Sequence, residues 1–368
     1  MKLIKFNKIL FGVAVVLSSL WLSSCNSSNS TKSPSQPQNP APQPQEPDSQ
    51  TQNPNPQEEQ PDSQPEQNPD DVLKFNVFGT NWQGYRSGSL EIDIDSGTIT
   101  DATTYNAQDL IIPNFVVFNN EHIVIKSIKK YAFAGNQYLK SVVIPEGVTT
   151  IGDIAFANCI NLTSITIPET AIAIGSEIFS GCTSLKSAII PDGVQNIGDY
   201  TFRDCVNLTS ITIPNSVNAI GISAFEGCAN LTSITVPLAV TKIGSGAFSG
   251  CSNLTSITIP NGVKKIDLFT FYDCTSLTSI IFPATITEIG KEAFYNCSNL
   301  ASIVLSTGIT NIGQAAFSGC SNTLVNGQKR NLFIPTTSPI DAINDWISGS
   351  ITLGGFNFIS TYWNIEKV

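Results

Sequence analysis

The segment Ile243-Gly-Ser-Gly-Ala-Phe-Ser-Gly-Cys-Ser-Asn-Leu-Thr-Ser-Ile-Thr-Ile-Pro-Asn-Gly-Val-Lys-Lys265 decides the fold, because its pattern recurs along most of the chain. The consensus is Ile-Gly-x-x-Ala-Phe-x-x-Cys-x-x-Leu-x-Ser-Ile-x-Ile-Pro-x-x-Val-x-x. Eight cysteines, each 23 residues after the one before, mark the period: Cys159, Cys182, Cys205, Cys228, Cys251, Cys274, Cys297 and Cys320. A fixed period predicts an array of one small unit. Eight copies cover residues 128–311, and a degraded ninth begins at Ile312.

The local structure of one unit can be predicted from its residue types. Apolar residues alternate at the end of residues 254–259, which predicts a short, half-buried strand. Pro260 ends this strand, because proline cannot donate to a strand ladder, and residues 261–262 (Asn-Gly) predict a turn. Residues 263–266 predict a second short strand. Residues 247–251 predict one turn of α- or 3₁₀-helix.

A single unit buries too few apolar side chains to fold alone, so stacked neighbours must supply the stability. We therefore predict a β-rich repeat solenoid over residues 128–323. Residues 73–127 contain strand-like alternation and an imperfect unit, which predicts an N-terminal β cap. Residues 324–368 predict a C-terminal cap, with Gly354-Gly355 as a hairpin turn. The aromatic residues expected to seal the last layer are Trp346, Phe356, Phe358, Tyr362 and Trp363.

The first 72 residues carry targeting signals rather than a fold. Residues 1–24 combine a lysine-rich start with an apolar stretch of signal-peptide length. The following Leu22-Ser-Ser-Cys25 resembles the lipobox of bacterial lipoproteins, which implies that Cys25 carries the lipid anchor. The alternative is an ordinary secretory signal with a chance cysteine. Residues 25–72 are rich in Pro, Gln, Asn and Ser, which predicts a disordered tether.

The repeat resembles the BspA-type (treponemal-type) leucine-rich repeats of bacterial surface proteins. The likeness rests on Leu-x-x-Ile-x-Ile-Pro and Ile-Gly-x-x-Ala-Phe-x-x-Cys, and it covers about residues 108–335. It implies a leucine-rich repeat array that is surface-exposed or secreted. It also implies adhesion to host matrix or plasma proteins, or coaggregation between bacteria. The resemblance supplies no catalytic or ligand-binding residues.

The cysteine column is expected to be structural. A spacing of 23 residues is not a metal-ligand spacing, and stacked layers would hold neighbouring sulfurs on parallel vectors that do not suit a disulfide. Asn136 occupies the cysteine position of the first unit. Asn and Cys can both donate a hydrogen bond to a turn carbonyl, whereas a metal or redox role would not tolerate this exchange. We therefore predict buried free thiols and no bound metal.

Composition gives no support to an enzyme or a nucleic-acid-binding protein. His122 is the only histidine, and no nucleophile is positioned near it by the pattern. There is no Gly-rich phosphate loop, and the formal net charge of −10 does not suit phosphate binding. We predict no catalytic residues, no cofactor and no nucleic-acid partner.

Binding surfaces are expected where outward positions depart from the consensus. The outward strand position is threonine in four units, Thr166, Thr212, Thr235 and Thr258. Apolar and aromatic departures gather toward the end of the array and form the candidate partner-binding set: Leu268, Phe269, Tyr272, Ile281, Tyr295 and Val304. Aromatic residues with an apolar surround suit protein recognition. The alternative is that Leu268 and Phe269 only repack around Asp267, which replaces the repeat glycine.

The sequence thus predicts a monomeric, non-catalytic lipoprotein of the cell envelope, anchored in the outer membrane and exposed at the surface. Its expected partner is a host matrix or plasma protein, or a surface protein of another bacterium. The alternative is a periplasm-facing structural lipoprotein that binds cell-envelope components, including glycans, through the threonine ladder.

Overall fold

The computed structural model describes residues 72–76, 89–320, 330–334 and 363–367. All of them belong to the compact unit Ser63–Val368. Their secondary structure consists of short strands and turns, and none of the described residues is in a helix. In particular, this part of the chain holds no apolar helix of the length needed to cross a bilayer. The fold is a β-solenoid of about eight turns with 23-residue repeats.

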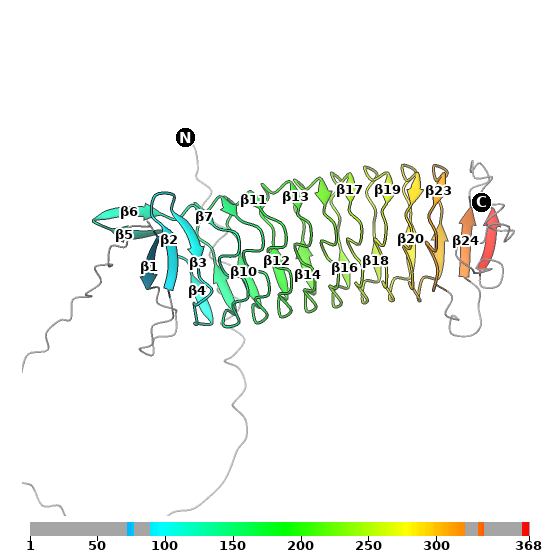
Figure 1. The fold of residues 1–368 in the computed structure, drawn as a ribbon. Helices are drawn as coiled ribbons and strands as arrows, with labels where there is room; N and C mark the ends of the chain where they lie inside the picture. The colour runs from blue at the N-terminus through cyan, green and yellow to red at the C-terminus, as the bar shows by residue number, and fades with distance from the viewer. Residues whose placement is uncertain (1–71, 77–88, 321–329, 335–362, 368) are drawn as a thin grey trace, which may run out of the picture. The chain divides into compact units, whose positions relative to one another are not determined.

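Two rows of short strands run along the array (Figure 1). The first row comes from the Ser-Ile-x part of each unit and contains β4 (Asp109–Ile111), β8 (Ser141–Val143), β10 (Ser164–Thr166), β12 (Ser187–Ile189), β14 (Ser210–Thr212), β16 (Ser233–Ile234), β18 (Ser256–Ile257), β20 (Ser279–Ile281), β22 (Ser302–Val304), β24 (Arg330–Ile334) and β25 (Trp363–Lys367). The second row ends at the isoleucine before the repeat glycine and contains β3 (Thr98–Asp101), β7 (Ser127–Ile128), β9 (Thr150–Ile151), β11 (Ala173–Ile174), β13 (Asn196–Ile197), β15 (Ala219–Ile220), β17 (Lys242–Ile243), β19 (Lys265–Ile266), β21 (Glu288–Ile289) and β23 (Asn311–Ile312).

Each row is divided into short sheets, within which neighbouring strands of the row pair in parallel through equivalent residues of successive units. Ser164 pairs with Ser141, and Ile243 pairs with Ile220. Each residue of the consensus therefore lies beside its copies and forms a column along the array. The strands predicted within residues 254–259 and 263–266 are present as β18 and β19. Each is shorter than predicted.

The helical turn predicted for residues 247–251 is wrong. This segment is a series of turns, because Gly246 and Gly250 adopt left-handed φ angles of 65° and 71° that interrupt a right-handed helix. The backbone N–H groups of Gly246, Phe248 and Gly250 instead donate to carbonyls of the next unit at 2.7–2.9 Å. The turns thus join neighbouring layers, as the strands do.

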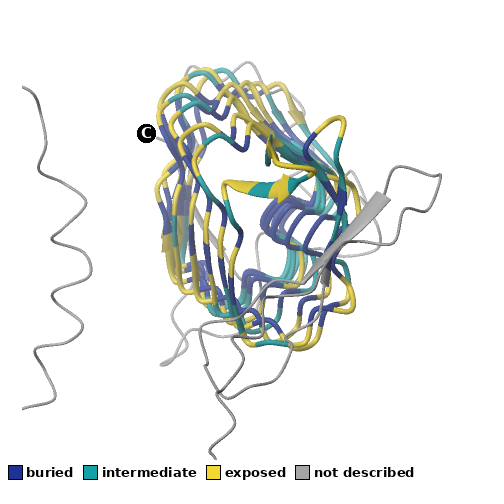
Figure 2. Cartoon of the chain, turned by 90° about the vertical axis from the view of Figure 1, so that its left-hand side faces the viewer, coloured by how far each residue is buried: buried dark blue, intermediate teal, exposed yellow. Residues whose placement is uncertain are grey.

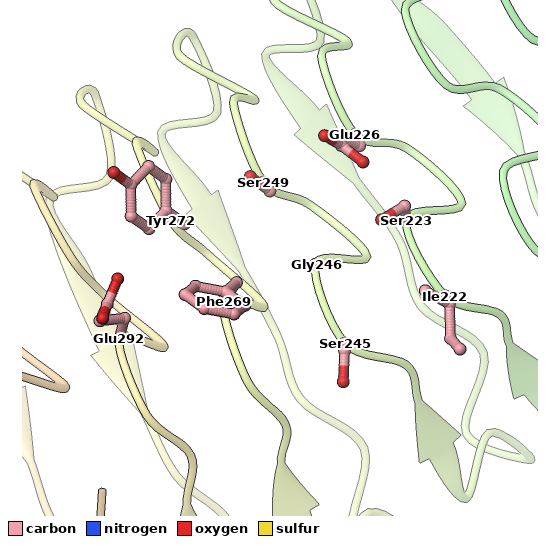
Figure 3. Close-up of a pocket in the computed structure, with 9 residues that line it drawn as sticks. All are labelled: Ile222, Ser223, Glu226, Ser245, Gly246, Ser249, Phe269, Tyr272 and Glu292. Carbon is pink, nitrogen blue, oxygen red and sulfur yellow. The ribbon is translucent and has the colours of Figure 1, made fainter. Parts of the chain in front are cut away.

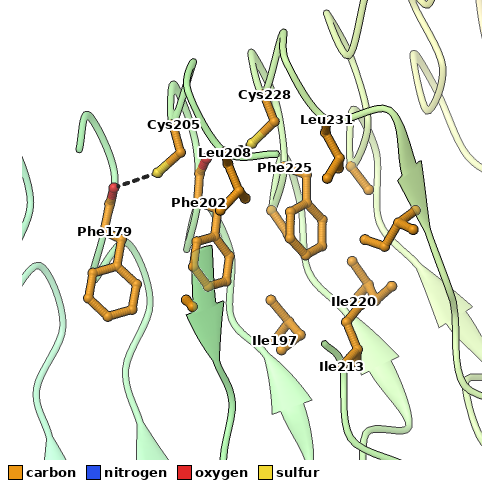
Figure 4. Close-up of a cluster of buried hydrophobic side chains, with 14 of the residues drawn as sticks. Phe179, Ile197, Phe202, Cys205, Leu208, Ile213, Ile220, Phe225, Cys228 and Leu231 are labelled. Carbon is orange, nitrogen blue, oxygen red and sulfur yellow. Dashed lines mark hydrogen bonds between the residues drawn. The ribbon is translucent and has the colours of Figure 1, made fainter. Parts of the chain in front are cut away.

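The core consists of stacked columns on the inside of each layer (Figure 2). The largest column is the repeat phenylalanine, whose neighbouring rings stack with centroids 4.7–6.1 Å apart. Its members are Phe133, Phe156, Phe179, Phe202, Phe225, Phe248, Phe271, Phe294 and Phe317. Figure 4 shows part of this column with the isoleucine and leucine side chains packed against it.

The N-terminal part of the described chain extends the same two rows. Strands β1 (Val72–Asn76), β2 (Ser89–Asp93) and β3 form an antiparallel sheet, and β3 pairs in parallel with β7. The imperfect unit pairs as a layer, since Leu110 of β4 lies opposite Val142. A hairpin of β5 (Phe115–Phe118) and β6 (Glu121–Val124) is inserted between β4 and β7.

At the C-terminal end, β24 pairs with β22 and β25 pairs with β24, all in parallel. Most of the predicted aromatic cap lies outside the described residues: Trp346, Gly354-Gly355, Phe356, Phe358 and Tyr362. Trp363 begins β25, and its backbone pairs with Arg330.

Candidate binding surface

The cysteine column is buried and its thiols are free, as predicted. The Sγ of Cys205 donates a hydrogen bond to the carbonyl of Phe179, in the preceding layer, at 3.1 Å (Figure 4). The other seven cysteines make the equivalent bond at 3.1–3.2 Å. Burial raises the pKa of the Cys251 thiol to about 12, so this thiol stays protonated at neutral pH. The cysteine column therefore has a structural role in the core and no reactive role.

Asn136 fills the cysteine position where the preceding layer is irregular. Its Nδ2 donates to the carbonyls of Ala102 and Tyr105 at 3.2 and 2.7 Å, and its Oδ1 accepts from the backbone N–H groups of Tyr138 and Leu139. A thiol could make only one of these donor contacts. The exchange of Cys for Asn thus follows from the geometry of the first layer.

Two columns of residues run along the turns of successive layers. Residues of the first turn column have left-handed φ angles of 48–68° whatever their type: Tyr131, Ile154, Glu177, Tyr200, Ser223, Gly246, Phe269, Glu292 and Ala315. The second turn column follows the repeat phenylalanine: Ala134, Ala157, Ser180, Arg203, Glu226, Ser249, Tyr272, Tyr295 and Ser318. The left-handed region is costly for non-glycine residues. The stacking of the layers therefore imposes this backbone, and the side chains it carries are free to vary.

Four of the six predicted binding residues come together on these columns. The rings of Tyr272 and Tyr295 stack with centroids 4.9 Å apart and planes 9° apart. Phe269 meets Tyr272 edge-on at 5.9 Å, and the neighbouring Leu268 is 41% exposed. Phe269 keeps the left-handed backbone of its column, so its side chain stays at the surface, half-buried. We refer to Leu268, Phe269, Tyr272 and Tyr295 as the aromatic patch.

A pocket of about 460 Å³ opens beside the aromatic patch (Figure 3). It forms because the two turn columns carry Ser223, Gly246 and Ser249, which are too small to fill the space between larger neighbours. Phe269 and Tyr272 lie on one side, and Ile222 and Glu226 lie on the other. Ser245 and Glu292 complete the lining. The sequence reasoning did not select Glu226 or Glu292 as site residues. The small residues Ser223 and Gly246, at equivalent positions of adjacent units, could have indicated a hollow there.

Comparison with models of protein families identifies the family to which this repeat belongs. The model of the BspA-type leucine-rich repeat region, with six copies, matches residues 115–232 and 219–338. The chain belongs to the BspA-type leucine-rich repeat family.

Several solved structures are similar to this BspA-type chain. A leucine-rich cell surface protein of Faecalibacterium prausnitzii is 28% identical, with 71% of this chain and 89% of that one covered and a TM-score of 0.42. A leucine-rich repeat protein of T. pallidum is 23% identical over 71% and 91%, with a TM-score of 0.37. The pneumococcal vaccine antigen PcpA is 15% identical over 81% and 98%, with a TM-score of 0.37. The search of curated proteins gives no match.

Ile281 and Val304 lie apart from the aromatic patch, on the strands of the BspA-type repeat. They face each other in the β20–β22 pairing and are exposed, Ile281 by 69%. They share the outward strand position with the four predicted threonines, which are also exposed. Exposed Ile189 interrupts that threonine ladder between Thr166 and Thr212, which the sequence analysis did not note. The six predicted residues thus form two separate surfaces.

The β5–β6 hairpin adds another exposed apolar surface to this BspA-type solenoid. Phe115, Val117 and Val124 are exposed on it. His122 stacks on Phe115 with ring centroids 4.4 Å apart. The sequence predicts this segment only as part of the N-terminal β cap.

Proposed function

We propose that this protein is a non-catalytic binding or adhesion protein that engages host or other bacterial surface proteins through its solenoid. The aromatic patch is the observation that carries this proposal. Tyrosine and phenylalanine rings supply large contact area at low conformational cost and are enriched where proteins bind each other. Leu268, next to Phe269 in the chain, is exposed and adds apolar surface to these rings.

Display at the surface is supported by the start of the chain. The lipobox ending at Cys25 provides an anchor, and the proline-rich segment to residue 72 provides reach. An outer-membrane lipoprotein with this arrangement would present a monomeric solenoid away from the lipid headgroups. The family to which the chain belongs agrees with this setting.

The aromatic patch can be tested by replacing Tyr272 and Tyr295 together with serine in the full-length protein. We expect the variant to lose at least tenfold in its affinity for proteins captured from serum, matrix or bacterial lysate, with an unchanged melting curve by circular dichroism. The matched control replaces Tyr138, an exposed tyrosine outside the aromatic patch, with serine. Equal capture by the tyrosine variant and the wild type would rule out this binding surface.

Protease shaving of intact cells tests the location. A surface protein loses its solenoid to external protease, whereas a periplasm-facing protein keeps it until the outer membrane is opened. Globomycin-sensitive processing and mass spectrometry of the mature N-terminus test the acylation of Cys25. An unmodified Cys25 would contradict the lipid anchor and favour an ordinary secretory signal.

A glycan-binding role is the second candidate, and the hydroxyl groups of the first strand row favour it. Besides the four threonines, Ser164, Ser187, Ser210, Ser233, Ser256 and Ser279 are exposed along this row. Replacing Thr235 and Thr258 with valine should weaken binding to purified cell-wall glycan if this row binds it. Retained binding would eliminate the strand row as the glycan site.

A further inference from the structure

The pocket beside the aromatic patch combines rings with carboxylates. Phe269 and Tyr272 stand at a steep angle of 69°, so they offer a ring face and a ring edge to the same space. Glu226 and Glu292 lie at opposite ends of the lining (Figure 3). None of the nine lining residues is a lysine, an arginine or a histidine. The chemistry of the walls is therefore aromatic and acidic.

Cations of the chain itself lie against aromatic rings of these turns at two other places. Arg203 lies over the ring of Tyr200 at 5.6 Å, and its Nε is 3.5 Å from a carboxylate oxygen of Glu226 in the next layer. Lys130 lies over the ring of Tyr131 at 5.1 Å, and its Nζ is 3.8 Å from Asp153 in the next layer. In both cases a cation contacts an aromatic ring of its own layer and a carboxylate of the following one.

At the pocket, Phe269 occupies the position of Tyr200, but Tyr272 and Tyr295 replace the cation and the carboxylate of that arrangement. Glu292, in the following layer but in the first turn column, lines the pocket instead, and no cation of the chain does. Glu226 and Glu292 pair with Arg203 and Lys291 at 3.5 and 3.3 Å, and neither cation lines the pocket. These pairs are partly exposed, so they hold the carboxylates weakly and leave oxygen lone pairs for another donor.

We propose that this pocket receives an arginine side chain of the protein partner, with the guanidinium against Phe269 and Tyr272 and bonded to Glu226 or Glu292. This inference rests on the proposed function, because it names the chemistry of the partner. Arginine fits better than lysine, since its planar guanidinium stacks on rings and bonds carboxylates through two N–H groups at once. A basic segment of the partner is the complementary surface.

The electrostatics of the rim agree with a cationic occupant. The pKa of Tyr272 is raised, first by partial burial and then by Asp273, Tyr295 and Glu292. The carboxylates of Asp273 and Glu292, which contribute to this shift, also attract a cation.

The test uses the full-length protein and two small probes, N-acetyl-arginine methylamide and its uncharged isostere, N-acetyl-citrulline methylamide. Binding is followed by ligand-observed NMR. We expect the arginine probe to bind at least fivefold more tightly than the citrulline probe. Ser249→Tyr should weaken the arginine probe at least fivefold, because a tyrosine there would continue the Tyr272–Tyr295 stack into the hollow. Ser180→Tyr, three layers away in the same column, is the matched control and should leave binding unchanged.

A second variant, Glu226→Gln with Glu292→Gln, keeps the shape and removes the charge, and it should also weaken the arginine probe at least fivefold. Equal binding of the two probes, no saturable binding of the arginine probe, or full binding by both variants would overturn the inference. The proposed function has a separate readout. If the Tyr272 and Tyr295 substitutions abolish partner capture while the arginine probe does not bind, the function stands and the pocket assignment falls. If the arginine probe binds but the tyrosine substitutions leave partner capture unchanged, the pocket assignment stands and the proposed binding surface falls.

Discussion

At the scale of the residue, one buried position shows how the array handles polar groups. The repeat cysteine places a weak donor against a carbonyl of the preceding layer, and Asn136 does the same work with four hydrogen bonds where that layer is irregular. Buried carbonyl and N–H groups are costly when they lack partners. The position therefore requires a small donor, and its identity depends on the number of groups it must satisfy.

Replacing Asn136 with alanine should lower the free energy of unfolding by about 3 kcal/mol or more, because several buried backbone groups lose their partner at about 1–3 kcal/mol each. Cys228→Ala should cost only about 1–2 kcal/mol, since it removes one weak hydrogen bond and one sulfur from the core. Urea unfolding at neutral pH measures both. An equal cost for the two variants would contradict the assigned role of Asn136.

The buried thiols should make stability depend on pH in the alkaline range. Burial raises the pKa of Cys251 from 9.0 to about 12, so the folded state keeps a proton that the unfolded state releases. The stabilisation is fully present below pH 9 and is lost as the pH rises toward 12, with a slope of up to about 1.4 kcal/mol per pH unit for this group. Guanidinium unfolding under reductant measures it. The slope for Cys251→Ala should be smaller; identical slopes would exclude the thiol as its source.

At the scale of the element, the turns are as regular as the strands because each layer lies directly on its neighbour. The repeat glycines show how close this contact is. A Cβ added at any of them would lie 2.3–3.1 Å from the preceding layer: Gly152, Gly175, Gly198, Gly221, Gly244, Gly290 and Gly313. The first turn column beside them keeps its left-handed φ angles for the same reason, since its N–H groups bond to the next layer.

Gly244→Ala should therefore destabilise the protein by about 1–3 kcal/mol through overpacking. Its new Cβ would meet the backbone carbon of Gly221 at 2.6 Å and the backbone nitrogen of Ile222 at 2.7 Å. Ser256→Ala, on the exposed side of β18, is the control and should change stability by less than about 0.5 kcal/mol. Thermal melts distinguish the two. A neutral Gly244→Ala would mean that the layers can separate freely.

At the scale of the whole molecule, stability passes from layer to layer through nearest-neighbour contacts. The phenylalanine stack and both strand rows join each unit only to the one before and the one after it. In such an array, local stability depends on the interfaces on either side. A destabilising substitution in a central layer should therefore lower the local stability of the adjacent layers first.

Phe225→Ala removes a ring that stacks on both Phe202 and Phe248, and it should cost about 3–5 kcal/mol. Hydrogen exchange followed by mass spectrometry should show the loss of protection centred on residues 197–248, with the layers beyond retaining more. A uniform loss along the whole array would show that it unfolds as one cooperative unit.

The sequence by itself determined the repeat, its 23-residue length, the two strands of each unit and the inward columns of Phe and Cys. These features could be predicted because each depends on residue types within one unit, and the unit recurs eight times in the chain. Only the tertiary structure decided which outward residues meet. Stacking places residues 23 positions apart side by side, so it brought Tyr272 to Tyr295 and set Ile281 and Val304 on a different surface. It also opened a pocket between Glu226 and Phe269, whose layers are separated by one layer of small residues. It also replaced the expected helical turn with left-handed turns, because hydrogen bonds between layers, which no single unit contains, fix the backbone there.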